Sequence, residues 1–364
     1  MRMNIPEHRK AIDKLDAQIV RLLNERTRHV LQIGELKIEV GEAIYAPQRE
    51  RMVLQRLRKL NGGPIKDESL RAIYREIMSS ALSLEKSMTI AYMGPEATFT
   101  HQAAMEKFGS SLRYSAQKTI ADIFTEVARN RADYGVVPVE NSTEGVVTHT
   151  LDMFVDSNLQ IVAQIILPIR FCLAGAATVP EVRRLYAHPQ ALAQCRLWVQ
   201  RNLANAEIIE ASSNARAAEL AGAKGAARNA GMKGGVAAIT GLLAAEKYDL
   251  KIIEQDIQDF TENATRFLVL GRQCGPATGC DRTSVMFSIA DQVGALYRAL
   301  EPFRRYKLNM TKIESRPSKR KAWEYFFFVD CDGHISDPKV AKAVAHLAGV
   351  CNFVKVLGSY PNSD

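Results

Sequence analysis

Residues 88–94 have the sequence Met-Thr-Ile-Ala-Tyr-Met-Gly, and the pattern of hydrophobic residues changes at this stretch. On its N-terminal side, apolar residues recur at helical spacing in three segments, 6–40, 47–60 and 67–84. An Asn-Gly-Gly-Pro breaker separates the last two of these segments. We therefore predict three helices and an all-α part of the chain that ends near residue 86.

On the C-terminal side of this stretch, short apolar runs alternate with helical segments, which predicts an α/β fold with a largely buried sheet. An Ala- and Gly-rich stretch, 215–235, is interpreted as a helix, a flexible loop and a returning strand. After residue 279, the order strand, helix, strand, strand, helix, strand is the split β-α-β arrangement. The predicted domains are residues 1–87, 88–275 and 281–364.

The length of 364 residues favours several domains, and the composition of 47% hydrophobic and 24% charged residues is that of a globular protein. No apolar run approaches the roughly 20 residues that span a bilayer, and the charged N-terminus lacks a secretion signal, so we expect a cytoplasmic protein without a membrane partner. Six dispersed cysteines disfavour a disulfide scaffold and a zinc site. The net charge of +8 is spread along the chain without a DNA-reading motif, so nucleic-acid binding is only a minor alternative.

Three cations on the first predicted helix suggest a binding site. Arg26 and Lys37 lie within about 20° of each other around the helix axis, whereas Arg9 lies about 100° from Arg26. A helix about 50 Å long cannot bury its apolar stripe against two shorter helices, so we expect a dimer that exchanges this helix. Arg9 would then serve the partner's site. From the residues alone, solvated surface cations remain an alternative.

Four segments of the all-α part resemble the all-helical chorismate mutase family: RKAIDKLD at 9–16, LLNER at 22–26, GELK at 34–37 and PQRER at 47–51. The resemblance covers nearly all of residues 5–86. It implies a pericyclic rearrangement, in which the protein holds the chorismate dianion in a compact conformer and stabilises charge on the breaking ether oxygen. Cations in a dry pocket suit both tasks.

The resemblance assigns chorismate binding to six charged residues: Arg9, Arg26 and Arg49 for the carboxylates and positioning, Lys37 for the ether oxygen, Glu50 for the hydroxyl, and Glu85 beside the same ether oxygen. Lys37 and Glu85 are the implied catalytic residues. A charged carboxylate at Glu85 would repel the developing negative charge, so we expect Glu85 to act protonated, with a raised pKa. Mutase activity should then rise on the acid side of neutrality. The sequence departs from some relatives at Ala46 and Ala81, where Asp and Ser can occur.

Four segments of the α/β part together resemble the prephenate dehydratase family: GPEATFTH at 94–101, PVENSTEG at 138–145, the run from His-Pro-Gln to Gln-Cys at 188–195, and NATRF at 263–267. Each segment is weak alone, but their order and spacing are specific, and the resemblance spans about residues 89–272. Polar groups at strand ends offer hydrogen-bond donors to an anion in a cleft between two α/β lobes. The resemblance implies a two-lobed fold similar to that of periplasmic binding proteins.

Prephenate is a dicarboxylate, and its dehydration expels CO2 and the ring hydroxyl, which requires a donor at the departing oxygen rather than a nucleophile. Thr265 is the expected catalytic donor, and no metal or organic cofactor is expected. The resemblance places ten residues around prephenate: Glu140, Asn141, Ser142, Thr143, Gln194, Ser213, Asn214, Thr265, Arg266 and Phe267. Arg266 would hold a carboxylate, with a structural salt bridge as the equal alternative. Cys195 is interpreted as packing, and Ala97 and Thr100 replace the Gly and Ser that are common in relatives.

Two C-terminal segments, 293–296 and 314–317, resemble the signatures of the ACT domain in phenylalanine-regulated dehydratases, over about residues 282–362. The resemblance implies a phenylalanine site at a dimer interface, formed by Gly294, Ala295, Leu296, Glu314, Ser315, Arg316 and Pro317. Phenylalanine would inhibit the dehydratase by shifting a two-state equilibrium. A plain α+β dimerisation module is the alternative.

Together the resemblances predict a multidomain fold, with an all-α mutase domain, a two-lobed α/β dehydratase domain and an α+β ACT domain. The expected protein is a homodimer or higher oligomer of phenylalanine biosynthesis, both an isomerase and a lyase. It would convert chorismate to prephenate and prephenate to phenylpyruvate, with phenylalanine as the inhibitor. Two alternatives remain: an enzyme that keeps only the dehydratase and uses its helices for dimerisation, and a non-catalytic amino-acid sensor.

Overall fold

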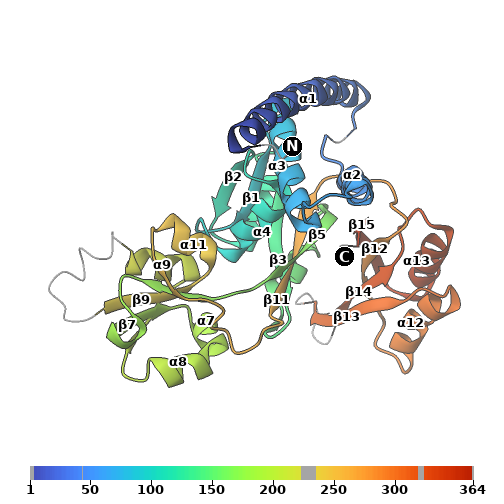
Figure 1. The fold of residues 1–364 in the computed structure, drawn as a ribbon. Helices are drawn as coiled ribbons and strands as arrows, with labels where there is room; N and C mark the ends of the chain where they lie inside the picture. The colour runs from blue at the N-terminus through green and yellow to red at the C-terminus, as the bar shows by residue number, and fades with distance from the viewer. Residues whose placement is uncertain (1–3, 43, 223–234, 319–323, 363–364) are drawn as a thin grey trace. The chain divides into compact units, whose positions relative to one another are not determined.

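The computed structural model describes residues 4–42, 44–222, 235–318 and 324–362 (Figure 1). The chain forms two compact units, one made of the residues up to 88 with 108–113 and the other made of 89–107 with 114–364. The loop that the sequence predicts within the Ala- and Gly-rich stretch falls at residues 223–234, which lie outside the described residues.

The first unit, here the helical unit, contains α1 (Ile5–Val40), α2 (Pro47–Leu60) and α3 (Asp67–Glu85), which confirms the three predicted helices. A capping box between Asn4 and Glu7 begins α1, and Gly41 ends it in the left-handed conformation, so local contacts satisfy both helix ends. The third helix contacts both of the others. Gly34 is nevertheless the single buried residue of α1, which is described over its whole length. One copy of the chain therefore leaves the apolar face of α1 uncovered.

The second unit begins with a sheet, here the first lobe, in the strand order β2-β1-β3-β11-β5, with β4 paired to β3. Its strands are β1 (Thr89–Met93), β2 (Arg113–Gln117), β3 (Tyr134–Asn141), β4 (Gly145–Val146), β5 (Gln160–Pro168) and β11 (Ala264–Gly271). Its helices are α4 (Phe99–Phe108), α5 (Ile120–Ala128) and α6 (Thr148–Met153). Strand β11 runs antiparallel between β3 and β5, so a segment from far along the chain completes this sheet.

A second sheet, here the second lobe, has the order β10-β6-β9-β7-β8. Its strands are β6 (Cys172–Gly175), β7 (Val182–Ala187), β8 (Glu207–Glu210), β9 (Gly235–Thr240) and β10 (Ile252–Glu254). Its helical elements are η1 (Val179–Glu181), α7 (Pro189–Gln194), α8 (Arg196–Asn202), α9 (Asn214–Ala221) and α11 (Leu242–Lys247). The chain enters this lobe after β5 and leaves it before β11, and these two crossings make the two-lobed α/β fold that the sequence predicts (Figure 1).

The C-terminal sheet has the order β13-β14-β12-β15 and is antiparallel throughout. Its elements are β12 (Asp281–Ser288), α12 (Ala295–Arg305), β13 (Met310–Pro317), β14 (Tyr325–Asp332), α13 (Pro338–Val350) and β15 (Phe353–Pro361). This order confirms the predicted split β-α-β arrangement. Gly294 caps the first of its helices with a left-handed φ of 74°, so this helix begins at Ala295.

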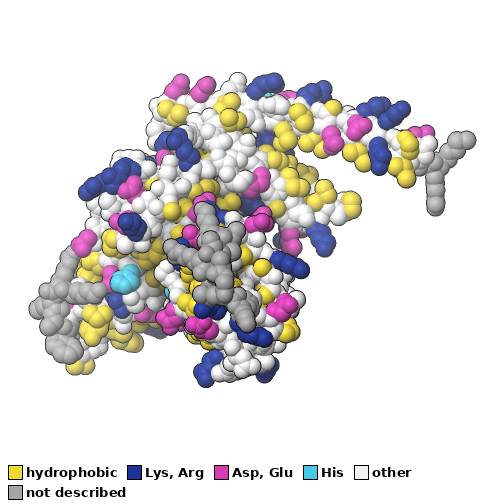
Figure 2. Space-filling view, turned by 90° about the vertical axis from the view of Figure 1, so that its left-hand side faces the viewer, with side chains coloured by type: hydrophobic (Ala, Val, Ile, Leu, Met, Phe, Trp, Pro, Cys, Tyr) yellow, Lys and Arg dark blue, Asp and Glu magenta, His cyan; other side chains and the backbone are white. Residues whose placement is uncertain are grey.

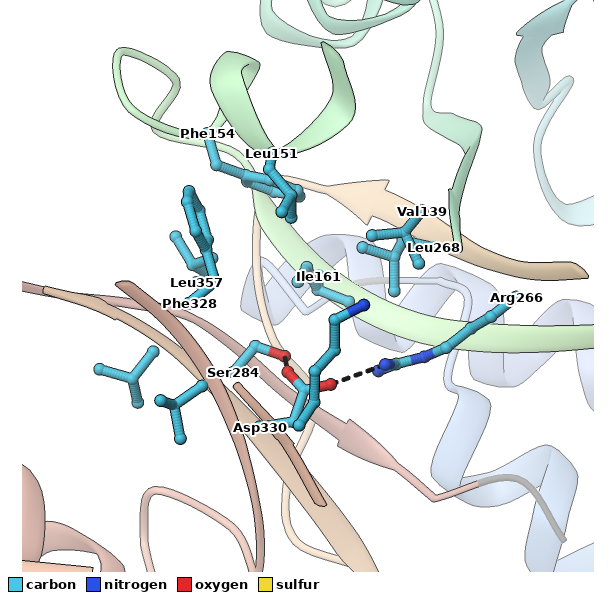
Figure 3. A pocket seen from close by; sticks show the side chains of 13 residues that line it. Val139, Leu151, Phe154, Ile161, Arg266, Leu268, Ser284, Phe328, Asp330 and Leu357 are labelled. Atoms are coloured by element: carbon cyan, nitrogen blue, oxygen red, sulfur yellow. Dashed lines mark hydrogen bonds and ion pairs between the residues drawn. The ribbon is translucent and has the colours of Figure 1, made fainter. Parts of the chain in front are cut away.

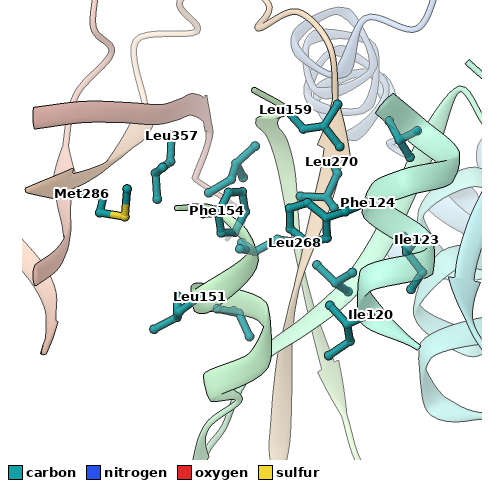
Figure 4. Close-up of a cluster of buried hydrophobic side chains, with 14 of the residues drawn as sticks. Ile120, Ile123, Phe124, Leu151, Phe154, Leu159, Leu268, Leu270, Met286 and Leu357 are labelled. Carbon is teal, nitrogen blue, oxygen red and sulfur yellow. The ribbon is translucent and has the colours of Figure 1, made fainter. Parts of the chain in front are cut away.

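Both faces of the C-terminal sheet are covered. Val285 and Phe287 of β12 belong to a core cluster on one face with residues of α12 and α13. Met286 and Leu357 point the other way and join a cluster that contains Phe154 and other side chains of the first lobe (Figure 4). The first lobe and the C-terminal sheet therefore share one hydrophobic core. This sharing places the C-terminal sheet directly behind strands β3 and β11.

Candidate active sites

The candidate site of the helical unit is built around Glu85, the last residue of α3. A methyl group at Gly34 would lie 2.9 Å from Glu85 Oε2, so the carboxyl group occupies space that only glycine leaves open on α1. Burial raises the pKa of Glu85, because water is removed from the carboxylate, and the charges of Lys37 and Arg26 oppose this increase. The structure thus brings three of the sequence-predicted residues into one electrostatic cluster.

Polar groups near this cluster are only partly satisfied. Lys37 Nζ donates to the backbone oxygen of Ile44 at 2.8 Å, and the Tyr45 hydroxyl donates to Glu50 Oε2 at 3.2 Å. Within the described residues, two buried side-chain atoms of this unit have no hydrogen-bond partner: Arg26 Nη1 and Gln48 Oε1. Leaving such groups unpaired costs about 1–3 kcal/mol each, so a bound polar ligand would stabilise them. Sequence analysis missed Gln48, whose one signal is its place in the segment PQRER.

Arg9 and Arg49 are exposed, and the structure does not bring Arg9 to the cluster. Seventeen residues separate Arg9 from Arg26 on the same helix, which corresponds to about 25 Å along the axis. The intervening apolar side chains are also exposed: Ile12 by 54%, Leu15 by 55% and Ile19 by 52%. Hydrophobic side chains accordingly lie along the surface of this helix in Figure 2.

The second candidate site lies where β3 ends and β11 begins. Asn141 Nδ2 donates to Thr265 Oγ1 at 2.8 Å and to Asn263 Oδ1 at 3.0 Å. The amide oxygen of Asn141 accepts from the Thr143 backbone N–H at 2.9 Å and from the Glu144 N–H at 3.0 Å, which fixes the orientation of the amide. Since Thr265 Oγ1 accepts a hydrogen bond here, its own proton is left for donation to another group.

Gln194 extends this network from the second lobe. Its Nε2 donates to Glu144 Oε1 at 3.1 Å and to Thr143 Oγ1 at 3.3 Å, while its Oε1 accepts from Asn263 Nδ2 at 2.7 Å. Asn263 is only 3% exposed and bridges Gln194 to Asn141. Sequence analysis quoted Asn263 and Glu144 within their motifs but did not assign them to the site. The sequence feature that could have identified them is position, because each lies within two residues of a residue that was assigned to the site.

Three further predicted residues lie near strand and helix ends. Ser142 Oγ accepts from the Ala264 N–H at 3.0 Å and so joins β3 to β11. Ser213 Oγ accepts from the Arg216 N–H at 3.0 Å and caps α9. Asn214 Oδ1 is buried and has no partner within the described residues. No hydrogen bond joins Ser213 or Asn214 side chains to Gln194 in the described part of the chain.

Glu140 and Arg266 point away from Thr265, because neighbouring side chains of a strand lie on opposite faces. The Arg266 guanidinium forms an ion pair with Asp330 at 2.6 Å, and Glu140 Oε2 forms one with Lys312 Nζ at 2.7 Å. Both partners belong to the C-terminal sheet. Of the two interpretations of Arg266, the geometry favours the structural salt bridge. Phe267 is 2% exposed and so is an interior side chain.

Two other predicted features can be located. Cys195 is fully buried, and burial raises the pKa of its thiol, as expected for a packing residue rather than a nucleophile. Ala97 adopts a φ of 66°, a conformation that favours glycine. Within the described residues, no helix has the length and hydrophobicity to cross a membrane, and no group of three His, Cys, Asp or Glu side chains could hold a metal ion.

The two phenylalanine signatures lie on different elements of the ACT-like part, the first at the start of α12 and the second on β13. Gly294 follows β12, whereas Glu314 and Arg316 lie on the edge strand β13, and β14 separates these two strands. Val293 is 99% exposed and Tyr297 is 72% exposed, so the N-terminal end of α12 presents an apolar surface.

Comparisons with known proteins match three parts of the chain. The family model of chorismate mutase type II matches residues 8–86, that of prephenate dehydratase matches 90–275, and that of the ACT domain matches 283–349. A bifunctional chorismate mutase/prephenate dehydratase of Aquifex aeolicus is 47% identical over 99% of this chain and 98% of its own length. A bifunctional relative from Neisseria gonorrhoeae is 45% identical over 98% of this chain and 96% of its own length.

A solved structure of similar fold is that of a prephenate dehydratase from Arthrobacter aurescens in complex with L-Phe. It has a TM-score of 0.68 and 33% identity, and the match covers 76% of this chain and 90% of that chain.

Proposed function

The chain belongs to the family of bifunctional chorismate mutase/prephenate dehydratases, and we propose that its two candidate sites carry the two reactions separately. Family membership gives the chain both activities, the conversion of chorismate to prephenate and of prephenate to phenylpyruvate. The helical unit is the mutase. The first and second lobes form the dehydratase, and the C-terminal sheet is the ACT domain.

In the mutase site, Arg26 binds a carboxylate of chorismate, while Lys37 and Glu85 donate hydrogen bonds to the breaking ether oxygen. The unpartnered Arg26 Nη1 supports this assignment, as does the raised pKa of Glu85, which keeps the carboxyl protonated to a higher pH. Gln48 adds a buried acceptor for the chorismate hydroxyl beside Glu50. The chemistry needs no covalent step, because binding the compact conformer and stabilising the developing charge lower the barrier.

A second copy of the chain completes this site with its Arg9. The exposed apolar residues of α1 supply the surface for such a dimer, and the separation of about 25 Å between Arg9 and Arg26 explains why one copy does not suffice.

Subunit mixing tests this dimer. Arg9→Ala and Arg26→Ala each inactivate the mutase alone, but a mixed dimer has one site with both arginines, so random exchange restores about a quarter of wild-type sites. The matched control mixes Arg26→Ala with Lys37→Ala, which lie on the same copy and leave every site defective. Absence of recovery in the first mixture, with exchange verified by mass, would contradict the shared site.

In the dehydratase site, the Thr265 hydroxyl donates a hydrogen bond to the departing ring hydroxyl, which leaves as water with a proton from solvent, while the electron pair released with CO2 completes the aromatic ring. The hydrogen bond from Asn141 to Thr265 Oγ1 is the observation that carries this proposal, because it orients the threonine proton away from Asn141. Gln194, Ser213 and Asn214 bind prephenate from the second lobe, and the unpartnered Asn214 Oδ1 accepts from the substrate hydroxyl or a bound water.

A coupled assay tests both activities at once. Purified protein is given chorismate, and chorismate loss and phenylpyruvate appearance are followed separately. Both signals are expected. Accumulation of prephenate alone would overturn the dehydratase site, whereas consumption of added prephenate with untouched chorismate would reduce the helical unit to a dimerisation element.

Phenylalanine binds the ACT domain and inhibits the dehydratase. Support comes from the ACT match at residues 283–349 and from the phenylalanine complex of the Arthrobacter aurescens relative. The left-handed Gly294 at the start of α12 leaves backbone N–H groups for a carboxylate, and Glu314 offers an anion for the ammonium group. Millimolar phenylalanine should slow prephenate turnover and leave the mutase rate unchanged, and unaltered dehydratase kinetics would contradict the regulation.

The enzyme works in the cytoplasm. All six cysteines are free, which is typical of proteins in a reducing compartment. Cell fractionation with an antibody to the chain tests this localisation.

A further inference from the structure

Two adjacent cross-strand residue pairs on β3 and β11 contact different parts of the molecule. Thr265 is the cross-strand partner of Asn141, and this pair forms the dehydration site. Arg266 is the cross-strand partner of Glu140, one residue away on each strand, and this pair reaches the ACT domain. The backbone positions of the two pairs are therefore linked by single peptide bonds, and a displacement of one pair moves the other.

The ACT domain contains a cross-strand pair with complementary charges. Lys312 on β13 and Asp330 on β14 are also cross-strand partners, and they bind Glu140 and Arg266 respectively. We call Glu140, Arg266, Lys312 and Asp330 the charge quartet. Its charges alternate in sign, so each member has an oppositely charged neighbour in its own sheet and another across the interface.

Most of the charge quartet is buried. The exposed fractions of the Arg266, Asp330 and Lys312 side chains are 10%, 9% and 12%, while that of Glu140 is 38%. Figure 3 shows Arg266 reaching Asp330 past Leu268, Val139 and other apolar side chains. Charge interactions are strong where water is excluded, so the quartet holds the two sheets in one relative position.

Uncharged groups fix the geometry of the Arg266–Asp330 ion pair, the more deeply buried of the two. Ser284 Oγ donates to Asp330 and lies 2.7 Å from the Tyr360 hydroxyl, which accepts from Arg266 Nη2 at 2.8 Å. Arg266 Nε donates to Gln164 Oε1 at 2.9 Å. With these partners the guanidinium has a single arrangement, so its strand follows any movement of β14.

We propose that Lys312 and Asp330 of the ACT domain are positioning residues for the dehydration site, and that the charge quartet transmits the effect of a ligand on the ACT domain to Thr265. This inference rests on the proposed roles of Asn141 and Thr265. Glu314 lies two residues after Lys312 on the same strand, about 7 Å away, so a ligand at the signature segment acts on a strand that contacts the quartet. A shift near 1 Å at a reacting group can lower a rate about 100-fold.

A charge swap tests the proposal. Lys312→Glu and Glu140→Lys each place like charges together, and we expect either change to lower the dehydratase kcat about tenfold with KM changed less than about threefold. The double variant Lys312→Glu/Glu140→Lys restores attraction across the interface and should be faster than either single variant. Recovery should be incomplete, because the exchanged charges lie beside Arg266 and Asp330 in their own sheets. The partial exposure of Glu140 makes this pair tolerant of substitution, whereas Asp330→Asn would leave a buried guanidinium uncompensated.

A second measurement distinguishes a loss of coupling between the ACT domain and Thr265 from a loss of folded protein. Calorimetric titration with phenylalanine should give the same stoichiometry for the single variants as for the wild type, while a higher phenylalanine concentration is needed for half-inhibition. The matched control is Asp152→Asn, which removes another ion pair between the first lobe and the ACT domain, that with Arg316 at 3.4 Å. Asp152 lies on α6 rather than on β3 or β11, so kcat without phenylalanine should stay at the wild-type value.

The outcomes are distinct. A double variant with a higher dehydratase kcat than either single variant supports the charge quartet as the link between the ACT domain and Thr265. Wild-type kcat and wild-type inhibition in both single variants would overturn it, and so would a double variant no faster than either single, because Glu140 would then act on prephenate directly. Thr265→Val in the same assay reports on the underlying site, since full activity there would remove the proposed donor whatever the swap shows.

Discussion

The two active sites differ in how far one copy of the chain completes them. In the mutase, a buried arginine nitrogen and a buried glutamine oxygen lack partners among the described residues, and the helix that carries the cations has only one buried residue. In the dehydratase, Asn141, Asn263 and Gln194 satisfy one another across two lobes. The proposed mutase site therefore leaves polar groups open to a substrate and to the second copy that we propose, whereas the proposed dehydratase site is organised within one chain.

The difference follows from the two folds. Three helices with a single long member cannot enclose a polar pocket, because the unit is too small to cover that helix on all sides. Two lobes joined by two crossings can hold polar side chains between them, and the ACT sheet supports the back of the first lobe. We expect mutase variants to be sensitive to association, and dehydratase variants to be sensitive to the packing behind the site.

Thr265→Val is the sharpest test of the dehydratase half. The variant keeps the shape of the side chain but removes the hydroxyl proton, so kcat should fall by about 10²- to 10⁴-fold. The mutase rate of the same sample should not change, since the two sites lie in different units. Thr265→Ser should retain most of the activity. A valine variant within about tenfold of the wild type would contradict the role of Thr265 as donor.

Gly34→Ala is the corresponding test of the mutase half. The added methyl group would meet Glu85 Oε2 at 2.9 Å and Glu85 Cγ at 3.0 Å, so the carboxyl group must move. We expect chorismate turnover to fall by about 10- to 100-fold, with prephenate turnover unchanged. Gly62→Ala is the matched control, because a methyl group there meets no atom within 4 Å. Equal mutase rates for the two variants would show that Glu85 does not need its present position.

Asn263→Ala probes the bridge between the two lobes. The change leaves Gln194 Oε1 and the amide of Asn141 each short of one partner, so we expect a loss of about 1–3 kcal/mol in the free energy of unfolding. Prephenate turnover should fall about tenfold because Asn141 no longer orients Thr265 as firmly. Denaturant titration and steady-state kinetics measure the two effects. Asn202→Ala, at an exposed asparagine on α8, should show neither.

Sequence patterns were sufficient to predict the three helices of the helical unit and the order of elements in the C-terminal sheet. The periodicity at residues 6–40 predicted α1 to within one residue, and the motif NATRF led to Thr265. What the motif could not show is that Arg266 faces the other way. Neighbouring residues of a strand share a motif but not a face, and Asp330, which fixes Arg266, lies 64 residues farther along the chain.

Two of the residues that sequence analysis missed are uncharged amides. Gln48 and Asn263 carry no charge pattern, and amides are common in loops and helix starts, so nothing in their spacing marks them. Their importance comes from burial: Asn263 is 3% exposed, and Gln48 Oε1 is buried without a partner within the described residues. Burial depends on the packing of distant segments, which local patterns do not report.

Glu85→Gln tests the proposed role of the Glu85 carboxyl in the mutase site. Of the variants considered, it should give the smallest change in rate. Burial raises the pKa of Glu85, so as the pH falls the carboxyl gains its proton earlier than an exposed glutamate would. The protonated form donates to the ether oxygen and the charged form repels it, so mutase kcat/KM should rise as the pH falls and decline as the pH rises through that pKa.

The amide of the Glu85→Gln variant donates a hydrogen bond at every pH. The variant should therefore stay active and lose this slope, whereas prephenate turnover should keep the same pH profile in both proteins. A wild-type mutase profile without an acid-side rise, or a variant with the same slope, would mean that Glu85 does not donate a hydrogen bond to the ether oxygen, which would then rely on Lys37.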